Sequence, residues 1–427
     1  MRLPMRPGAT NSLVDVAGLR VGHARRVGGG HRTGTTVVLA PPDGAVAGVD
    51  VRGAAPGTRE TELLDPRNLV ERVHAVVLSG GSAFGLGAAC GVMDRLADAG
   101  AGYPVAGGAV PIVPAAVIFD LGRGGTFRAV PDATLGAAAY DAATDAAYDP
   151  AYDPAYDPAY DPATGAAADS PPPLLSSGPE VFGRDGSSGE APATPDGAKP
   201  SVPTAGGGGG VLASPSLEGT PAPDGGGRFA QTTAPPTVSG SVGAGTGAVA
   251  GGLAGGVGTA SAVLPDGTTV AVLAVVNAAG SVLDPRDATL AGTRYGLPGE
   301  FDHLGPPSPE EATAWNPDRT PAFNTTIGVV ATDLTLTKAQ CGKLAAVAHD
   351  GLARAIRPAH TMTDGDTVFG LATCARPAPG HDAFQDVLAA AADVFSRAVA
   401  HAVLAATGRE GAPAYLDVFP SALRSRP

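Results

Sequence analysis

The chain has 427 residues, a formal net charge of −13 and 5% aromatic side chains, so its core must be built from closely packed Ala, Val and Leu. An acidic chain without a Lys/Arg-rich stripe offers nucleic-acid phosphates no attraction, and nucleic acid is excluded as a general partner. Cys90, Cys341 and Cys374 have no C-x-x-C spacing, which excludes a disulfide framework and a cysteine-rich zinc site. Residues 1–15 contain no apolar stretch long enough for a signal peptide or membrane span, so we expect a cytoplasmic protein without membrane contact.

Residues 1–140 alternate short Val/Ile/Leu runs with glycine-rich turns. Residues 85–100 differ, because their apolar side chains recur at helical spacing and the segment ends at glycine, which predicts a helix. The apolar runs predict strands at 35–41, 46–51, 73–81 and 110–122. This mixture indicates an α/β layer architecture for the first part of the domain.

The composition changes at residues 141–234, where four tandem AYDP units at 147–162 are followed by runs of Pro, Ser, Gly and Asp. Such a segment buries too little apolar surface to offset its ordering entropy, so we expect a disordered insertion. The regular tyrosine spacing leaves an alternative, an array of exposed aromatic side chains that binds a partner.

Ordered patterning resumes at residue 235. The Asp266-Gly267 turn joins two apolar runs and predicts a hairpin over 260–277. A strand rich in β-branched residues is expected at 324–336. Three elements complete the chain: a helix that begins with the capping box Thr337 to Gln340 and stops at Pro358, a strand at 367–373 and an Ala-rich helix at 383–406.

The tripeptide Asn324-Thr325-Thr326 stands at the start of a predicted strand, directly after a loop rich in Pro and polar residues. A hydroxyl there would lie at a sheet edge facing open space. Two other interpretations fit the same residues. One is a glycosylation sequon, which requires a secretory route that the sequence does not indicate. The other is a β-favouring Thr pair within a strand.

Two further motifs are set aside. Residues 243–248 fit the dinucleotide fingerprint G-x-G-x-x-A, but no apolar strand precedes them and no helical pattern follows. Ser82 in GGSAFGL suggests a serine nucleophile, yet Phe84 stands where a nucleophile elbow requires Gly. Instead, Ser82 is expected in a loop that lines the substrate pocket.

Four motifs occur together in order: VAGLRVGHA at 16–24, VDVRGAAPGTRETELLDP at 49–66, LSGGSAFGL at 78–86 and NTTIGVVATD at 324–333. With them the chain resembles the L-aminopeptidase/D-esterase (DmpA-type) family, which includes the β-peptidyl aminopeptidases and the nylon-oligomer endo-hydrolase. The resemblance covers nearly all of the chain outside the insertion. It implies an αββα four-layer sandwich that cleaves itself and exposes a new N-terminal Ser or Thr as nucleophile.

By this resemblance the cut lies between Asn324 and Thr325, so that 235–324 ends the large chain and 325–427 is the small chain. The hydroxyl of Thr325 would attack the Asn324 carbonyl, and water would open the resulting ester. The cut releases an α-amino group, whose ordinary pKa of roughly 7.7 to 8.0 lets it accept the hydroxyl proton near neutral pH without a histidine. The expected substrates are small peptides, amides or esters, and the expected assembly is a homo-oligomer of cleaved αβ heterodimers.

The resemblance also assigns roles to other residues. Asp364 and Asp366 are implied as partners of the nucleophile, whereas local sequence alone favours a D-G turn with solvated acids. Asn277 is implied as a donor to the developing oxyanion, although it could equally end a strand in a turn. Ser82 and Phe119 are expected to contact substrate. No cofactor is expected, and no metal, since two acids without clustered His give too few ligands.

One position departs from the family pattern: Ala254 stands in GGLAGGVGTAS where relatives usually carry Lys. A lysine near the nucleophile can tune its amine and help to bind an anion. Its loss leaves open an alternative, a catalytically weak or inactive relative that serves as a binding or scaffold protein.

Overall fold

The computed structural model describes residues 4–144, 160–161, 166–167, 239–317 and 323–424. Residues 1–156 and 228–427 form one compact unit, to which all elements below belong except β10 (Tyr160–Asp161) and β11 (Ala166–Ala167). These two short strands pair antiparallel in a separate unit. The predicted disordered insertion and its AYDP units otherwise lie outside the described residues.

Two sheets form the centre of the main unit. The six-stranded sheet has the order β14 (Gly256–Val263), β15 (Thr269–Val276), β16 (Ile327–Leu334), β17 (Thr367–Arg376), β3 (Ala45–Val51) and β5 (Arg72–Val73). All neighbours in it are antiparallel except β16 and β17. The five-stranded sheet has the order β1 (Arg20–Gly28), β2 (His31–Leu39), β6 (Ala75–Ser79), β9 (Ala115–Val117) and β4 (Thr58–Arg59).

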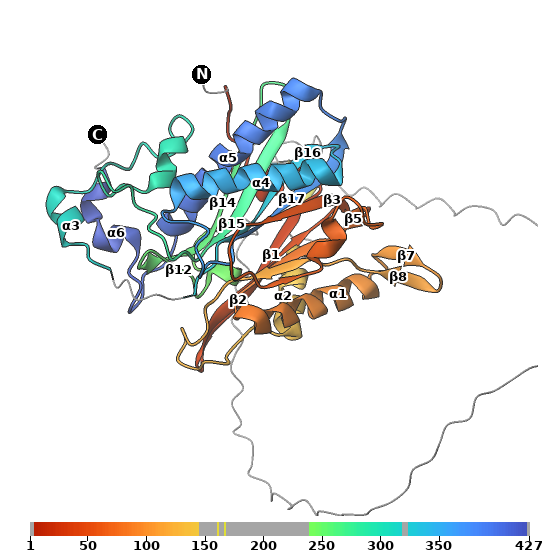
Figure 1. The fold of residues 1–427 in the computed structure, drawn as a ribbon, viewed down its shortest axis with the longest axis horizontal. Helices are drawn as coiled ribbons and strands as arrows, with labels where there is room; N and C mark the ends of the chain where they lie inside the picture. The colour runs from red at the N-terminus through yellow and green to blue at the C-terminus, as the bar shows by residue number, and fades with distance from the viewer. Residues whose placement is uncertain (1–3, 145–159, 162–165, 168–238, 318–322, 425–427) are drawn as a thin grey trace, which may run out of the picture. The chain divides into compact units, whose positions relative to one another are not determined.

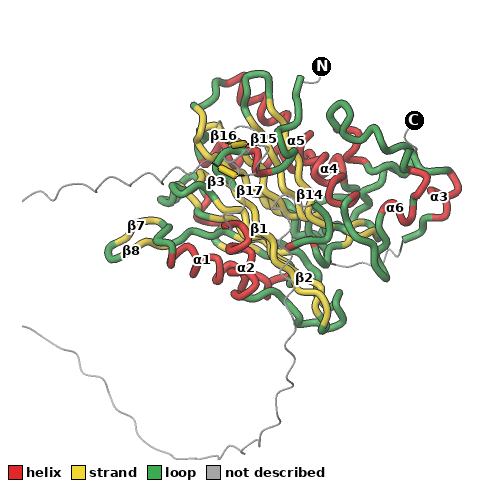
Figure 2. Tube along the Cα trace, turned by 180° about the vertical axis from the view of Figure 1, so that it is seen from behind, coloured by secondary structure: helices red, strands yellow, loops and turns green. Residues whose placement is uncertain are grey.

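Helices cover the outer face of each sheet (Figure 1). α4 (Lys338–Ala355) and α5 (His381–Leu404) pack on the six-stranded sheet, and α1 (Ala88–Asp98) and α2 (Ala133–Thr144) pack on the five-stranded sheet. The same layering is visible from behind in Figure 2. The predicted αββα sandwich is therefore confirmed. The remaining short elements are β7 (Tyr103–Val105), β8 (Gly108–Val110), β12 (Val249–Ala250), β13 (Leu253–Ala254), α3 (Pro309–Ala314) and α6 (Tyr415–Val418).

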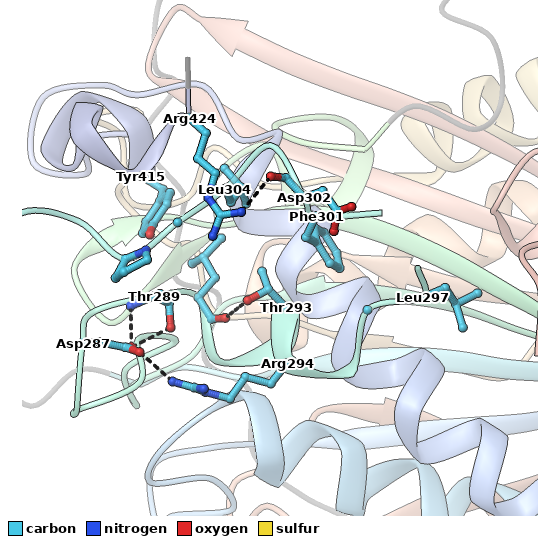
Figure 3. Close-up of a pocket in the computed structure, with 14 residues that line it drawn as sticks. Asp287, Thr289, Thr293, Arg294, Leu297, Phe301, Asp302, Leu304, Tyr415 and Arg424 are labelled. Carbon is cyan, nitrogen blue, oxygen red and sulfur yellow. Dashed lines mark hydrogen bonds and ion pairs between the residues drawn. The ribbon is translucent and has the colours of Figure 1, made fainter. Parts of the chain in front are cut away.

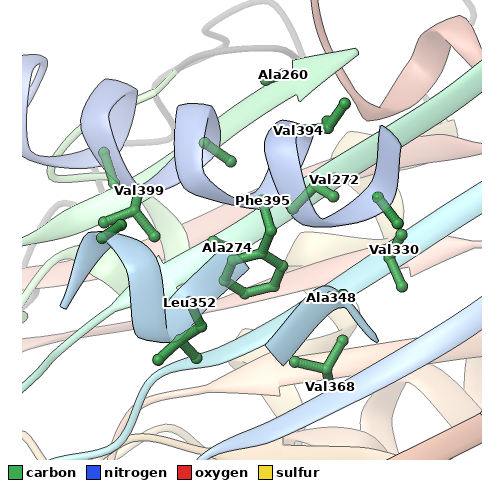
Figure 4. Packing of buried hydrophobic residues seen from close by; sticks show 14 of the residues in the cluster. Ala260, Val272, Ala274, Val330, Ala348, Leu352, Val368, Val394, Phe395 and Val399 are labelled. Atoms are coloured by element: carbon green, nitrogen blue, oxygen red, sulfur yellow. The ribbon is translucent and has the colours of Figure 1, made fainter. Parts of the chain in front are cut away.

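Apolar side chains fill the space on both faces of the six-stranded sheet. Along β15, Val272 and Ala274 face α4 and α5, while Leu273 and Val275 face the other sheet. Figure 4 shows Phe395 of α5 lying over these outward-facing residues of the sheet. Burial on both faces explains why this strand reads as one continuous apolar run.

Small residues let the layers approach closely. A Cβ atom added to Gly351 of α4 would lie 2.1 Å from the carbonyl oxygen of Ala392 in α5. The many Ala and Gly residues of the sequence thus replace bulky aromatic side chains by close backbone contact. Among the described residues, α5 alone is long and apolar enough to cross a membrane, but 78% of its apolar window is buried, so it serves as a core helix.

Several local predictions agree with the structure. The hairpin β14–β15 turns at Gly267 with a φ of 84°, and the side chain of Thr337 accepts from the backbone N–H of Gln340 at the start of α4. The predicted strand at 110–122 is interrupted: Val110 ends β8 in the two-stranded sheet with β7, and only Ala115–Val117 joins the five-stranded sheet, because the nearby prolines donate no ladder hydrogen bond. α2 runs through Thr144, so the predicted start of the insertion at residue 141 falls within its last turn.

Candidate active site

Thr325 lies two residues before the start of β16 and is 4% exposed. Its backbone N–H donates to the carbonyl oxygen of Asn277, at the end of the neighbouring strand β15, over 2.6 Å. Its hydroxyl donates to the carbonyl oxygen of Asn324, the residue on the other side of the peptide bond that the sequence predicts to be cut. The predicted nucleophile therefore contacts the predicted electrophilic group.

The backbone of Asn324 is held by the loop before β17. Its N–H donates to the carbonyl oxygen of Thr363 at 3.1 Å, and its carbonyl oxygen accepts from the N–H of Gly365 at 3.2 Å. The N–H of Gly365 thus points at the oxygen that would become negative if the Asn324 carbonyl were attacked. No sequence motif reveals this donor, because a backbone N–H has no sequence signature.

Asp366 and Asp364 are both 2% exposed, so neither is a solvated turn acid. Asp366 accepts from the backbone N–H of Thr326 at 2.8 Å through Oδ1, and from the N–H and Nδ1 of His360 at 3.0 and 2.8 Å through Oδ2. Asp364 accepts from the N–H and hydroxyl of Thr361 at 2.9 and 2.6 Å. The structure therefore brings both predicted acids next to Asn324, Thr325 and Thr326 as buried, hydrogen-bonded groups.

A pair of histidines, His360 and His349, stands behind Asp366. The rings meet edge to face with centroids 4.9 Å apart, and Nε2 of His349 donates to the backbone oxygen of Asp50 at 3.0 Å. Burial lowers the pKa of His349 to about 4, so its ring is neutral at neutral pH. The sequence analysis missed His360, since its contact with Asp366 depends on a backbone with a φ of 59° that no local pattern predicts.

The segment RGAAPG at 52–57 explains one of the sequence motifs. The N–H of Arg52 donates to the backbone oxygen of Asp366 at 3.0 Å, and the N–H of Ala55 donates to the backbone oxygen of Asp364 at 2.8 Å. A Cβ atom at Gly53 would lie 2.2 Å from the nitrogen of Asp366, so only glycine permits this approach. The motif therefore holds the loop that carries Asp364 and Asp366 in place, although the motif itself precedes the predicted small chain 325–427.

Asn277 is fully buried, and its side chain is held on three sides. Oδ1 accepts from Nη1 of Arg123 and from the N–H of Val249 at 3.1 Å, while Nδ2 donates to the carbonyl oxygen of Phe119 at 3.2 Å. Asn277 is thus next to Thr325, because its backbone oxygen accepts the N–H of Thr325. Its side-chain Nδ2, which is predicted to face the oxyanion, donates to Phe119 in the uncleaved chain.

Arg123 is a further residue that the sequence analysis did not single out. Nη1 also donates to the oxygen of Gly247 at 2.7 Å, and Nη2 donates to Oδ1 of Asn324 at 3.4 Å. Burial lowers the pKa of Arg123 to about 10, with Asp120 opposing and Arg409 assisting, so the guanidinium stays charged at neutral pH. Its only sequence signal is a lone basic residue among the glycines that follow Phe119.

The two predicted substrate-contacting residues follow neighbouring strands, Phe119 after β9 and Ser82 after β6. The Phe119 ring packs 5.7 Å from that of Phe323, the residue before Asn324. Ser82 begins a 3-10 turn, and its N–H donates to the oxygen of Ile118 at 2.9 Å. The ring of Phe119 thus packs on the residue before Asn324, and its carbonyl oxygen binds Asn277. Ser82 is hydrogen-bonded to Ile118, the residue before Phe119.

Ala254, where the family resemblance leads us to expect a lysine in relatives, lies in an apolar setting. It is fully buried in a small cluster with Ala406 and Ala412. On the neighbouring backbone, however, Nη2 of Arg409 donates to the oxygens of Gly247 and Ala248 at 3.0 and 2.8 Å. Arg123 and Arg409 thus share the Gly247 oxygen as an acceptor, close in sequence to the strand that pairs with Ala254.

A cavity of about 340 Å³ lies elsewhere, between the segment 287–306 and the C-terminal residues Tyr415 and Arg424 (Figure 3). Asp287 and Arg294 close one side of it through an ion pair of 2.8 Å. None of the residues around Thr325 lines it, so this cavity is not the predicted catalytic site.

A model of Peptidase family S58 matches residues 11–147 and 224–414. The chain belongs to peptidase family S58. This confirms the resemblance found in the sequence motifs, and the unmatched stretch between the two ranges falls inside the predicted insertion.

Similar S58 chains include uncharacterized aminopeptidases of two mycobacteria. The Mycobacterium tuberculosis protein is 41% identical over 97% of this chain and 100% of its own length. The Mycobacterium leprae protein is 41% identical over 96% of this chain and 95% of its own. Their names describe them as aminopeptidases.

Solved structures share the S58 fold at low identity. A Burkholderia β-aminopeptidase is 18% identical, with a TM-score of 0.58 over 100% of this chain and 98% of its own. The L-aminopeptidase D-Ala-esterase/amidase of Ochrobactrum anthropi, described as a variant of the Ntn hydrolase fold, is 17% identical, with a TM-score of 0.53 over 95% of this chain and 89% of its own. These likenesses establish the fold.

Proposed function

We propose that this chain is an aminopeptidase or amidohydrolase that cuts itself between Asn324 and Thr325 and then uses Thr325 as an N-terminal nucleophile. The observation that carries the proposal is the contact between the Thr325 hydroxyl and the Asn324 carbonyl oxygen, on which the N–H of Gly365 also converges. A nucleophile beside a carbonyl that already has a backbone donor is the arrangement that acyl transfer requires.

In the cut itself, Oγ1 of Thr325 bonds to the carbonyl carbon of Asn324 and the C–N bond of that peptide breaks. The hydroxyl proton ends on the nitrogen of Thr325, which leaves as an amine, and Asn324 becomes an ester of the hydroxyl. Water then opens the ester, giving a carboxylate on Asn324 and a free hydroxyl on Thr325.

In turnover, the freed amine of Thr325 accepts the proton of its own hydroxyl. The carbonyl oxygen of Asn277 already binds this nitrogen at 2.6 Å, so the amine is in position before the cut. The N–H of Gly365 stabilises the oxyanion. Nδ2 of Asn277 becomes a second donor once its hydrogen bond to the carbonyl oxygen of Phe119 is broken. Asp366 fixes the backbone of Thr326 and thereby the direction of Thr325.

The names of the relatives support the substrate class of the proposal. The mycobacterial relatives are named aminopeptidases, and the structural neighbours are named for β-aminopeptidase, L-aminopeptidase, D-Ala-esterase and amidase activity. We therefore propose small peptides, amides or esters as substrates. A cytoplasmic homo-oligomer of cleaved heterodimers is part of the same proposal.

The first test is intact-mass measurement on purified wild type and Thr325→Ala. Wild type should yield chains 1–324 and 325–427, whereas the alanine variant should stay one chain of 427 residues without activity on aminoacyl p-nitroanilides, because no oxygen attacks Asn324. Thr325→Ser should still cut, more slowly, since the methyl group that restricts the rotamer is lost.

Thr326→Val is the matched control, because it removes the adjacent hydroxyl and keeps the shape and the N–H bonded to Asp366. It should still cut before Thr325. A small chain that begins elsewhere, or a Thr325→Ala variant that still splits there, would overturn the assignment. A single uncut wild-type band would favour the scaffold alternative raised by Ala254.

A further inference from the structure

Asn324 occupies the place that the acyl residue of a substrate must take. In the proposed function the same hydroxyl of Thr325 attacks first the Asn324 carbonyl and later a substrate carbonyl. The two carbonyl groups must therefore lie in the same position relative to Thr325 and the N–H of Gly365. The uncleaved chain thus shows how an acyl residue is bound.

Each part of Asn324 then marks a subsite. Its N–H, at 3.1 Å from the oxygen of Thr363, marks the position of the substrate α-amino group. Its carbonyl oxygen marks the oxyanion position beside Gly365. Its side-chain Oδ1, at 3.4 Å from Nη2 of Arg123, marks the position of the substrate side chain.

The charge of Arg123 decides which side chain fits best. Within the described ranges, this mostly buried guanidinium donates to three neutral oxygens, from Gly247, Asn277 and Asn324; burial lowers its pKa and the nearby carboxylate of Asp120 opposes this shift, but that carboxylate neither accepts a hydrogen bond from it nor forms an ion pair with it. By contrast, the fully buried Arg397 pairs with Glu300 over 2.7 and 2.9 Å. A buried cation with only neutral acceptors gains more from an incoming carboxylate than from an amide.

The length of the side chain is also set by the geometry. Aspartate places a carboxylate oxygen where Asn324 places Oδ1, because the two side chains have the same shape. The glutamate side chain is longer by one methylene, and the alanine side chain is too short to contact Arg123. Arg409, which donates to the same Gly247 oxygen as Arg123, adds positive potential on this side of the site.

We propose that Arg123 determines specificity by binding the side-chain carboxylate of an aspartyl residue on the acyl side of the scissile bond, so that the preferred substrates are N-terminal aspartyl peptides or amides. This proposal rests on the proposed function. It assigns Arg123 to substrate recognition and leaves the chemical step to Thr325.

The test compares kcat/KM of the cleaved wild-type protein for the p-nitroanilides of L-Asp, L-Asn, L-Glu and L-Ala. The Asp substrate should exceed Asn and Glu by about tenfold and Ala by more, because a charge-assisted hydrogen bond replaces a neutral one or none. In Arg123→Gln the Asp-to-Ala ratio should fall at least tenfold, mainly through KM. In the control Arg354→Gln, whose guanidinium pairs with Asp393 between α4 and α5, this ratio should stay as in wild type.

Because Arg123 also contacts Asn277, the glutamine variant could fail to cut itself, and wild type alone then decides. Free L-aspartate should inhibit hydrolysis of the Ala substrate at least tenfold more strongly than L-asparagine. Equal rates for Asp and Ala, or equal inhibition by the two amino acids, would overturn the assignment and leave the proposed function standing. A wild-type chain that neither cuts before Thr325 nor hydrolyses any of these substrates would overturn both.

Discussion

Two groups of charged side chains near Thr325, an acidic flank and a cationic flank, form hydrogen bonds with different kinds of partner. On the acidic flank, the carboxylates of Asp364 and Asp366 accept N–H and O–H donors from their own loop. On the cationic flank, Arg123 and Arg409 donate to neutral carbonyl and amide oxygens from segments far away in the sequence.

The difference separates two kinds of task. A carboxylate whose acceptor positions are filled by neighbouring N–H groups is suited to holding the backbone in one geometry. A guanidinium without a carboxylate partner keeps capacity for an anion that arrives from outside. In our proposals the acidic flank positions the nucleophile, and the cationic flank is the side that meets substrate.

The largest effect is expected for Asp366→Asn. The substitution replaces one of the two acceptor oxygens, of which Oδ1 faces Thr326 and Oδ2 faces His360, so the direction of Thr325 is lost, and turnover should fall by about 100- to 1000-fold. The free energy of unfolding should also drop, by about 1–3 kcal/mol, because a buried donor loses its partner. Single-turnover kinetics measure the first effect, and urea unfolding of the substitution in the uncut Thr325→Ala background measures the second.

Asp333→Asn is the matched control for that variant. Asp333 is a buried acid at the other end of β16, where it accepts the N–H of Thr269 at 3.1 Å. The Asp333→Asn variant should show a similar drop in the free energy of unfolding and keep its activity. Equal activity loss in the two variants would remove the special role of Asp366.

A smaller effect is expected for Asp364→Asn. Its side chain accepts from Thr361, while its backbone oxygen holds Ala55, and the substitution leaves that backbone contact in place. Turnover should therefore fall about tenfold, within the range of a lost orienting contact. A loss as large as that of Asp366→Asn would show that both acids act directly on the nucleophile.

The smallest effect concerns stability alone and tests the histidines behind the acidic flank. The folded-state pKa of His349 is lowered from 6.5 to about 4, so protonation favours the unfolded chain. Its stabilising contribution is complete above about pH 6.5 and is lost as the pH falls toward 4, amounting to about 3 kcal/mol from the size of that shift.

Urea unfolding of the uncut Thr325→Ala chain between pH 4 and 8 measures this dependence, because a single chain refolds without a partner. His349→Gln in the same background retains a donor for Asp50 and lacks the titration, so its stability should vary less with pH. Parallel pH curves for the two proteins would contradict the assignment.

The sequence predicted the layer architecture and, through the family resemblance, five residues that the structure brings together: Asn277, Asn324, Thr325, Asp364 and Asp366. It did not predict α2, because the Ala-rich run beside the insertion has few large apolar side chains. Leu135, Ala139 and Ala143, which are buried at a spacing of four, carried the helical signal.

The missed site residues share a physical reason. Arg123 meets Asn277 and Asn324, which lie 154 and 201 positions later in the chain, and only the packed sandwich brings them together. The N–H of Gly365 is a backbone group, and His360 reaches Asp366 from an unusual backbone conformation. Local patterns report elements, whereas these contacts depend on the tertiary fold.

The strand order of the six-stranded sheet makes the proposed maturation a one-way step. β16 and β17 follow the cut, yet they lie between β15 and β3, which precede it. After cleavage two separate polypeptides are interleaved in one hydrogen-bonded layer, and neither can leave without dismantling the core. The uncut chain folds by a unimolecular reaction, but the denatured mature protein must bring two molecules together, at a rate that depends on concentration. If the chain matures as proposed, the cleaved protein depends on a slow unfolding rate for its survival, and a molecule that unfolds at low concentration is lost from the active population.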